Sequence, residues 1–428
     1  MKSKNDDALE KPVTLDGGES EKAEAVLASE AEAAFEHVAA TEETSSVPES
    51  QLATSEQKTA TAPEHRQDNP AGAYFFRMAL LVVILIVTFL VSACLGRYSI
   101  SPAELLTVIG AAIQSWWEQV VALFTGGVAS VSEETAEALS GQVPTLLLEV
   151  RLPRIIVCVF VGAALSVAGA SYQGLFQNPM CSQDVLGASS GAAFGAALGI
   201  LLGFGSIMIS VSAFVCGLVA VALSYVVSKL SRGNAILALI LAGMVVSSLF
   251  SSGTSAIKLV ADTEEVLPAI TYWLMGSLAS IRSSQVLPTL ALIVIATLPI
   301  FLLRWRINLL ATGEEEAKSM GLNTGALRLI VIGCATFLTA TCVSVSGLIG
   351  WVGLVIPHFC RLMLGNDYRR IIPASMLMGA SFLLVVDDFA RLLVTSEIPI
   401  GILTSFVGAP IFLFLLVKGG AIHRGTKR

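Results

Sequence analysis

Few residues of this sequence could do polar chemistry, and five of them stand out because they interrupt long apolar runs. Arg151 and Arg154 flank a Leu-Pro pair, and Asp387, Asp388 and Arg391 lie close together near the end of another apolar segment. Asp387 and Arg391 are four residues apart, about one helical turn, so their side chains can pair. Arginines at the ends of membrane helices often extend toward the lipid headgroups. On the residues alone, these charges indicate helix ends at a membrane surface.

The motifs of several enzyme and carrier classes are missing. No GxxxxGK[ST] run occurs, so the chain has no P-loop for nucleotide phosphates. No TVGYG-type filter is present, and the apolar segments hold almost no ionisable residues at mid-depth, where an ion-coupled carrier usually keeps some. The seven cysteines lack CxxC spacing and the four histidines are scattered, so we predict no metal site. We expect no catalytic residue in this chain and a separate protein as its source of energy.

The composition is that of a membrane protein with an acidic tail. Of 428 residues, 54% are hydrophobic and 14% are charged, whereas a soluble domain carries about 25% charged residues. Residues 1–70 hold 16 of the 33 acidic and 6 of the 26 basic residues, so the remainder is mildly basic. Because 1–70 has little to bury, we predict a disordered cytoplasmic tail there. No Lys/Arg cluster favours nucleic acid.

Apolar segments predict an all-α membrane protein, a polytopic bundle of about ten transmembrane helices. A helix needs about 20 apolar residues to cross the hydrocarbon core. On that basis we expect spans at 74–95, 153–173, 187–204, 206–228, 235–257, 285–304, 326–345, 347–364, 371–392 and 400–418. Residues 71–420 would form the transmembrane permease domain, and 421–428 a cytoplasmic C-terminus.

One more apolar segment, 105–131, decides the number of spans. Its Gln114, Trp116, Trp117 and Glu118 favour a helix that lies at the membrane surface. With ten spans, most basic residues beside the helices fall on one side, which the positive-inside rule makes cytoplasmic. Both termini are then cytoplasmic, and we expect a multi-pass protein of the plasma or inner membrane.

Glycines recur at every fourth residue of the third predicted span. Gly187, Gly191, Gly195 and Gly199 would form one strip along a helix. Such a strip lets a second backbone approach closely. The pattern predicts tight helix packing and says nothing about a substrate.

The connection 308–323 between the sixth and seventh spans predicts a short, stiff helix. Glutamates at 314–316 would occupy its first turn, where acids suit the positive end of the helix dipole. Lys318 follows Glu314 by four residues, and Gly321 is a natural C-terminal cap. This helix could be a solvated connector, but it would also suit a loop that receives force from a soluble partner.

Further motifs follow in unbroken order from about residue 74 to 418. They include Arg151-Leu-Pro-Arg154, Asn178-Pro179, Leu186-Gly187-Ala-Ser-Ser-Gly191, Tyr272-Trp273-Leu-Met-Gly-Ser277, Gly353-Leu-Val-Ile-Pro-His358 and Ile398-Pro-Ile-Gly401. Together they resemble the FecCD permeases, the membrane subunits of type II ABC importers for iron–siderophores, haem and vitamin B12. The tail, a longer outer loop at 97–150, and Met180-Cys181 and Gln183 after the Asn-Pro pair depart from the usual family pattern.

The resemblance implies partners and roles for particular residues. It implies a second permease subunit (an identical copy or a paralogue), two ABC ATPase subunits that bind ATP-Mg, and an extracytoplasmic substrate-binding protein, with no cofactor on this chain. It implies docking of that binding protein on Arg151, Arg154 and Arg391. Coupling to the ATPase would use Asn308, Leu309, Leu310, Gly313, Glu314, Glu315, Lys318 and Gly321.

We therefore expect the permease subunit of a binding-protein-dependent ABC importer, working by ATP-driven alternating access. A metal chelate would be its cargo, with an iron–siderophore complex first and haem or a corrinoid as alternatives. Two other classes stay open, an ion-coupled secondary carrier and a non-transport receptor or scaffold that uses the tail.

Overall fold

Every regular element in the described part of the chain is a helix. The computed structural model describes residues 70–96, 98–125, 132–231 and 234–425, so the predicted acidic tail lies outside it except for Pro70. The helices are α2 (Pro70–Cys94), α3 (Pro102–Thr125), α4 (Glu133–Ala138), α5 (Gln142–Thr145), the π-helix η1 (Leu146–Arg151), α6 (Leu152–Leu175), α7 (Ala188–Leu201), α8 (Ser206–Leu230), α9 (Ala235–Val260), α10 (Val266–Leu274), α11 (Ser283–Leu310), α12 (Glu314–Ser319), α13 (Thr324–Ser346), α14 (Val352–Leu364), α15 (Tyr368–Leu392) and α16 (Ile400–Gly425).

The predicted polytopic helical membrane protein is confirmed, and each of the ten predicted spans has a helix. Seven helical segments are long and apolar enough to cross a membrane, and they contain α2, α6, α8, α9, α11, α13 and α15. The other three, α7, α14 and Ile400–Phe414 of α16, are shorter apolar helices. The segment that contains α6 begins earlier than predicted, at Gln142, because α5, η1 and α6 follow one another without a break.

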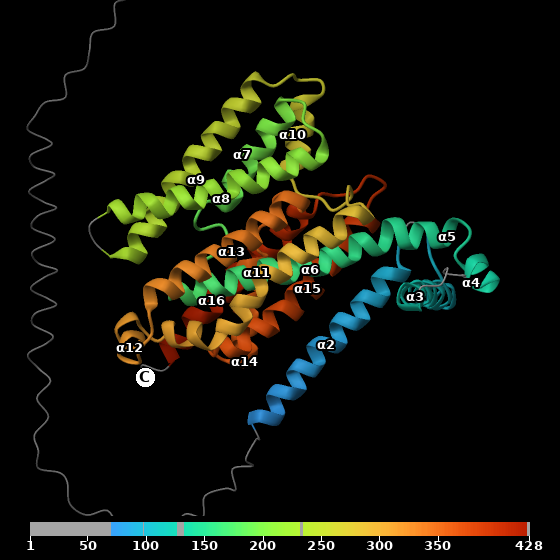
Figure 1. Cartoon of the computed structure of the whole chain (residues 1–428). Coiled ribbons are helices and arrows are strands. Elements are labelled where there is room, and N and C mark those ends of the chain that lie inside the picture. The colour runs from blue at the N-terminus through green and yellow to red at the C-terminus, as the bar shows by residue number, and fades with distance from the viewer. Residues whose placement is uncertain (1–69, 97, 126–131, 232–233, 426–428) are drawn as a thin grey trace, which may run out of the picture. The chain divides into compact units, whose positions relative to one another are not determined.

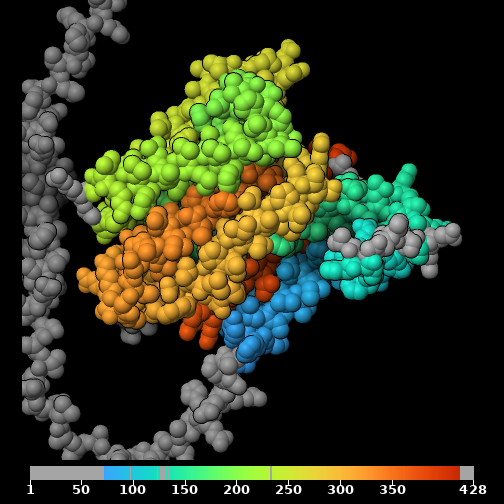
Figure 2. All heavy atoms as spheres, in the orientation of Figure 1, coloured from blue at the N-terminus to red at the C-terminus, as the bar shows by residue number. Residues whose placement is uncertain are grey.

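Helix α6 lies at the centre of the bundle. It packs against α11, α13, α14 and α15, and nearly all of its residues are buried. Helices α7, α8 and α9 pack mainly on one another and form a layer over α13, which Figures 1 and 2 show in green above the orange helices. We call the end of the bundle that carries α12 the α12 end, and the opposite end, beside α3, the α3 end (Figure 1).

Two irregular segments precede the short apolar helices α7 and α14. Helix α7 has 14 residues and α14 has 13, so at about 1.5 Å per residue neither crosses a hydrocarbon core of about 30 Å. Residues 176–187 lead into α7, and residues 347–351 lead into α14. Non-helical backbone is tolerated at membrane depth only where protein surrounds it. The polar groups of these segments therefore need partners inside the protein.

Two buried glutamines supply such partners. Gln173 donates from Nε2 to the carbonyl oxygens of Cys181 and Leu354, at 3.2 and 3.3 Å. Gln183 donates to the carbonyl oxygen of Ile349 at 3.3 Å, which ties the two irregular segments together. Since an unsatisfied buried polar group costs about 1–3 kcal/mol, these bonds stabilise the breaks.

The apolar segment that we predicted to lie at the membrane surface forms α3. Figure 1 shows α3 end-on, whereas α2 beside it is seen along its length. Leu105 and Val108 are buried, but Trp116, Trp117 and Phe124 are exposed by 63%, 60% and 85%. Exposed tryptophans beside the end of a spanning helix are typical of a membrane–water interface.

The glycine strip of α7 packs on α8. A methyl group on Gly195 would lie 2.3 Å from the carbonyl oxygen of Ser212, and one on Gly191 would lie 2.5 Å from that of Cys216. Gly199 has more room, with its nearest neighbour at 3.4 Å. The fourth predicted strip residue, Gly187, directly precedes the helix.

We expect Gly195→Ala to lower the melting temperature of the purified chain, since a group forced into a close-packed contact costs about 1–3 kcal/mol. Gly199→Ala is the matched control and should melt near the wild-type temperature. Thermal unfolding in detergent, followed by loss of the folded peak in size-exclusion chromatography, measures both. Equal melting temperatures for the two variants would contradict the α7–α8 contact.

Candidate functional site

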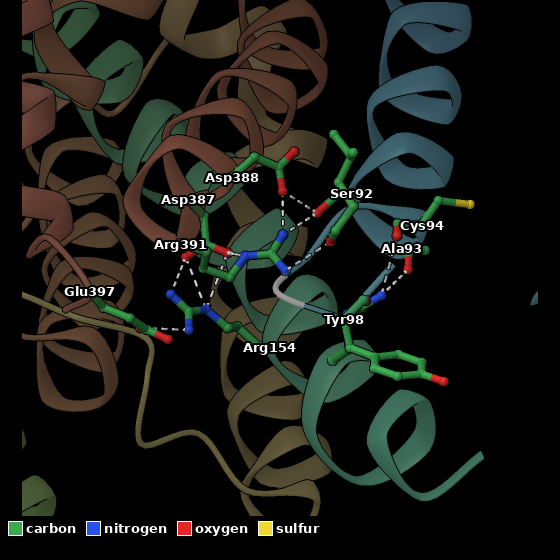
Figure 3. Close-up of polar contacts among 11 residues, drawn as sticks. Ser92, Ala93, Cys94, Tyr98, Arg154, Asp387, Asp388, Arg391 and Glu397 are labelled. Carbon is green, nitrogen blue, oxygen red and sulfur yellow. Dashed lines mark hydrogen bonds and ion pairs between the residues drawn. The ribbon is translucent and has the colours of Figure 1, made fainter. Parts of the chain in front are cut away.

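A buried polar cluster lies at the α3 end, where α2 and α15 end and α6 begins (Figure 3). Arg154, in the first turn of α6, donates to both carboxylate oxygens of Asp387, with its shortest bond of 2.8 Å from Nη2 to Oδ1. Its Nη1 donates to Glu397 Oε2 at 2.8 Å. Asp387 is fully buried and Arg154 is 8% exposed. Bonds from a guanidinium to carboxylates are among the stronger hydrogen bonds in proteins.

Arg391 lies on the other side of Asp387. Its Nε is 3.2 Å from Asp387 Oδ2, so the pair predicted from the four-residue spacing is present. Its Nη2 also contacts Asp388 and donates to Ser92 Oγ, and that hydroxyl in turn donates to Asp388 Oδ1 at 2.7 Å. Because Ser92 belongs to α2, these bonds fasten α2 to α15.

Arg151 satisfies the end of α2. Its Nη1 donates to the carbonyl oxygen of Ala93 at 2.9 Å, and its Nη2 to that of Tyr98 at 2.7 Å. The last carbonyl oxygens of a helix lack donors within the helix, and Arg151 supplies donors to those of α2. Arg151 is the last residue of the π-helix η1, two residues before Pro153, which has no N–H to continue the helical hydrogen bonds.

These contacts fix how the three arginines are placed. Arg151, Arg154 and Arg391 are only 6–8% exposed, and each donates to groups of the same chain. A docking partner would have to displace the internal carboxylates or bind beside them, so docking on these side chains stays a prediction. Sequence reasoning missed Ser92 and Glu397, because no spacing pattern relates either residue to Arg154.

At the α12 end, the predicted short helix is present as α12, but it is confined to Glu314–Ser319, and Asn308, Leu309 and Leu310 form the last turn of α11 because that helix runs beyond the predicted span. Glu314 accepts hydrogen bonds from Lys318 Nζ at 2.9 Å and Arg328 Nη2 at 2.9 Å. These two donors hold the pKa of the Glu314 carboxyl below its usual value, so it is ionised at neutral pH. Gly321 follows the helix with a φ of +79°, as expected for a C-terminal cap.

The exposed surface of α12 differs in part from the predicted set. Glu315 and Lys318 point to solvent, but Glu314 is half-buried against Arg328. Glu316 and Met320, which were not in the predicted set, are also exposed. The exposed side of α12 is therefore acidic, with one large apolar side chain at 57% exposure.

The residues before α12 connect it to α6 and α15. Asn308 Oδ1 accepts from the backbone N–H of Tyr368 at 2.8 Å, at the start of α15. Gln177, in the turn after α6, donates to the carbonyl oxygen of Leu310 at 3.0 Å. Of the other predicted residues, Leu309 and Gly313 are half-buried. These two hydrogen bonds therefore connect the residues before α12 to the turn after α6 and to the start of α15.

A third feature is a pocket of about 540 Å³ next to α10 and α16. Its lining carries no charge and consists of Leu274, Met275, Leu348, Gly350, Gly401, Ile402, Ser405 and Phe406. Backbone bonds join its three walls, from Ser277 to Ser346 at 2.8 Å and from Gly401 to Met275 at 3.1 Å.

Comparison with known proteins identifies the family of this chain. The sequence model of the FecCD transport family matches residues 84–418. The chain is 37% identical over 338 residues to the molybdate import system permease protein of Haemophilus influenzae. This match covers 79% of this chain and 94% of that protein. It is 38% identical over 273 residues to an iron chelatin transport system permease protein of Helicobacter pylori, covering 64% and 82%.

A solved structure is similar as well. It is described as an inward-facing conformation of a metal-chelate type ABC transporter, and it matches with a TM-score of 0.68 at 36% sequence identity. The match covers 81% of this chain and all of that one.

We expect Arg154→Met to destabilise the protein strongly, because it removes a partner of the buried Asp387. Breaking a buried ion pair costs about 3–5 kcal/mol, which should appear as a large fall in the melting temperature in detergent. Glu397→Gln serves as the control at the partly exposed side of the same arginine, where we expect a loss of about 1 kcal/mol or less. Similar melting temperatures for the two variants would show that the Arg154–Asp387 pair does not hold the helices together.

Proposed function

Because this chain belongs to the FecCD transport family and is a permease of an ABC importer, we propose that it carries a metal chelate, with an iron–siderophore complex as the first candidate. The uncharged pocket beside α10 and α16 is the observation that supports this cargo. A large chelate covers its metal with organic groups, which apolar side chains such as Met275 and Phe406 can contact.

Three other cargoes are alternatives. Haem and a corrinoid are also large and would suit the same lining. Molybdate, the cargo named for the Haemophilus influenzae relative, is a small anion, and binding it would call for hydrogen-bond donors or cations. The lining of this pocket carries no cation, which favours the larger chelates.

We assign the α12 end to the cytoplasm. Basic side chains beside the spans concentrate there, including Arg304, Arg306, Arg328, Arg369 and Arg370, as the positive-inside rule requires. Both termini are then cytoplasmic, and the arginine cluster with α3 faces outward. ATP hydrolysis falls to two separate ATPase subunits at the α12 end, and a second permease subunit completes the central path.

Coupling is assigned to α12 and the residues that brace it. The exposed Glu315, Glu316 and Met320 form the surface that would meet an ATPase, while Glu314 stays bound to Arg328 and keeps the helix stiff. Movement of the ATPases would pass through Asn308 to α15. The path would then open alternately to the two sides of the membrane.

Docking of the binding protein is assigned to the α3 end. Arg151, Arg154 and Arg391 hold the ends of α2, α6 and α15 together there, and a partner's carboxylates could bind only beside their internal ones. Glu397, at 27% side-chain exposure, is the member of the cluster most open to a partner. Charge reversal of these arginines would not isolate docking, because their side chains are buried and the variants would also destabilise the fold.

Gentle purification of the tagged full chain from its native membranes tests the proposed function. We expect a P-loop ATPase in about equal amount and a binding protein to co-purify. That binding protein should bind a ferric siderophore more tightly than haem, cobalamin or molybdate. Substrate uptake into liposomes that hold this chain without any ATPase, driven by an ion gradient, would instead support a secondary carrier.

We expect the double variant Glu315→Lys/Glu316→Lys to lose most ATP-driven uptake while it remains folded, since both side chains are exposed and unpaired in the described part of the chain and each acid in the first turn contributes at most about 1 kcal/mol. Uptake is measured in proteoliposomes with the partner ATPase. The control Glu264→Lys/Glu265→Lys reverses two exposed glutamates in the connection between α9 and α10 and should transport normally. Equal uptake by the two double variants would remove α12 from the coupling route.

A further inference from the structure

A polar pocket lies at the α12 end, where α2, α11 and α15 meet. It has a volume of about 530 Å³. Its lining brings together three guanidinium groups, two aromatic rings and one carboxylate, from Arg304, Arg369, Arg370, Tyr74, Trp305 and Asp367. None of these side chains belongs to the uncharged pocket or to the predicted coupling set, so the proposed function leaves this cluster unexplained.

The single carboxylate does not neutralise the three cations. Asp367 is held by Arg369, whose Nη2 lies 2.8 Å from Oδ2, and Arg370 is more distant, with Nε at 3.6 Å from the same oxygen. Burial raises the pKa of Asp367, but the hydrogen bonds from Arg369 outweigh it and hold that pKa below its usual value. The carboxylate is therefore ionised at neutral pH, and the pocket keeps an excess of positive charge.

Two of the guanidinium groups have donors to spare. Arg304 donates from Nη1 to its own helix, at the carbonyl oxygen of Phe301, and lies 4.1 Å from the centre of the Phe301 ring. It has no carboxylate partner among the described residues. Arg370 lies over the Tyr74 ring at 5.2 Å and makes only the long contact to Asp367. The aromatic rings hold both groups in place without using their N–H donors.

The pocket lies at the border of the lipid-facing surface. Leu298 and Leu302 of α11 are 54% and 63% exposed, and their spacing of four residues, with Trp305 three residues further on, places all three on one side of the helix. Trp305, at 50% exposure, is the type of residue that marks the headgroup level. A ligand with a charged head at the arginines of the pocket and an apolar chain along Leu302 and Leu298 would match both surfaces.

We propose that this pocket binds the phosphate group of an anionic phospholipid from the leaflet at the α12 end. Guanidinium groups bind phosphate oxygens through paired charge-assisted hydrogen bonds, and basic pockets between helices on the cytoplasmic side suit anionic headgroups. The excess positive charge disfavours a zwitterionic headgroup, whose own cation would approach the arginines. The site would hold α2 against α11 and α15 next to the Asn308–Tyr368 bond of the coupling region.

Native mass spectrometry of the full chain in detergent tests this site. The chain is titrated with phosphatidylglycerol or with phosphatidylcholine of the same acyl chains, and the fraction with bound lipid is measured. We expect phosphatidylglycerol to bind about tenfold more tightly. The double variant Arg304→Gln/Arg370→Gln should lose that preference. The control Lys229→Gln removes an exposed cation from the last turn of α8, outside the pocket, and should keep it.

Asp367→Asn gives a result that loss of folding cannot imitate. It removes the only carboxylate of the pocket while an amide can still cap α15, so phosphatidylglycerol should bind more tightly than to the wild type. Equal binding of the two lipids, or an unchanged preference in the double arginine variant, would overturn the proposal. Displacement of the lipid by an equal concentration of inorganic phosphate would overturn it too, since the pocket would then be a site for a free anion.

Discussion

Inside the hydrocarbon layer no water is available, so the backbone groups of this protein that lie there must find their partners within the chain. That constraint explains the features on which the fold depends. Three arginines enter the apolar bundle at the α3 end, and each is matched there by a carboxylate or by helix-end carbonyls. Where the backbone leaves the helical path before α7 and α14, the amides of Gln173 and Gln183 supply the missing donors.

The same pairing joins distant parts of the bundle. Arg361 of α14 donates to Gln173 Oε1 at 2.7 Å. Gln173 in turn donates to the carbonyl oxygen of Cys181, in the irregular segment before α7. Gln177 and Asn308 tie the residues before α12 to the ends of α6 and α15. The broken segments, the loop helix and the central helix therefore form one connected set of hydrogen bonds. Chains of packed side chains and hydrogen bonds of this kind are one route by which two distant sites of a protein can be coupled.

Much of the fold could be predicted because apolar length and loop charge are properties of local sequence. Each of the ten predicted spans has a helix, although only seven helical segments are long enough to cross a membrane. Helix α12 was also predicted, since its glutamates, Lys318 and Gly321 identify it without any tertiary information. The family predicted from the motifs is the one whose model matches the chain. The continuous helix from Gln142 through η1 was missed, because the predicted span began only at residue 153.

The pairing of side chains could not be predicted in the same way. Arg154 and Asp387 are 233 positions apart, and only the packing of α6 against α15 brings them together. Sequence patterns place both at helix ends and cannot tell whether an arginine there faces solvent, lipid or another helix. The role of Gln183 was likewise hidden, because its partner is a backbone carbonyl of a different span.

The central claim is that force enters this protein at α12 from a separate ATPase. A photo-crosslinking amino acid in place of the exposed Met320 tests it most directly, in native membranes that hold the whole transporter. We predict a crosslinked product that contains a P-loop ATPase, and none from the same group placed at Trp117 on α3. Absence of the ATPase product at Met320, together with its presence at Trp117, would contradict both the coupling surface and the proposed orientation.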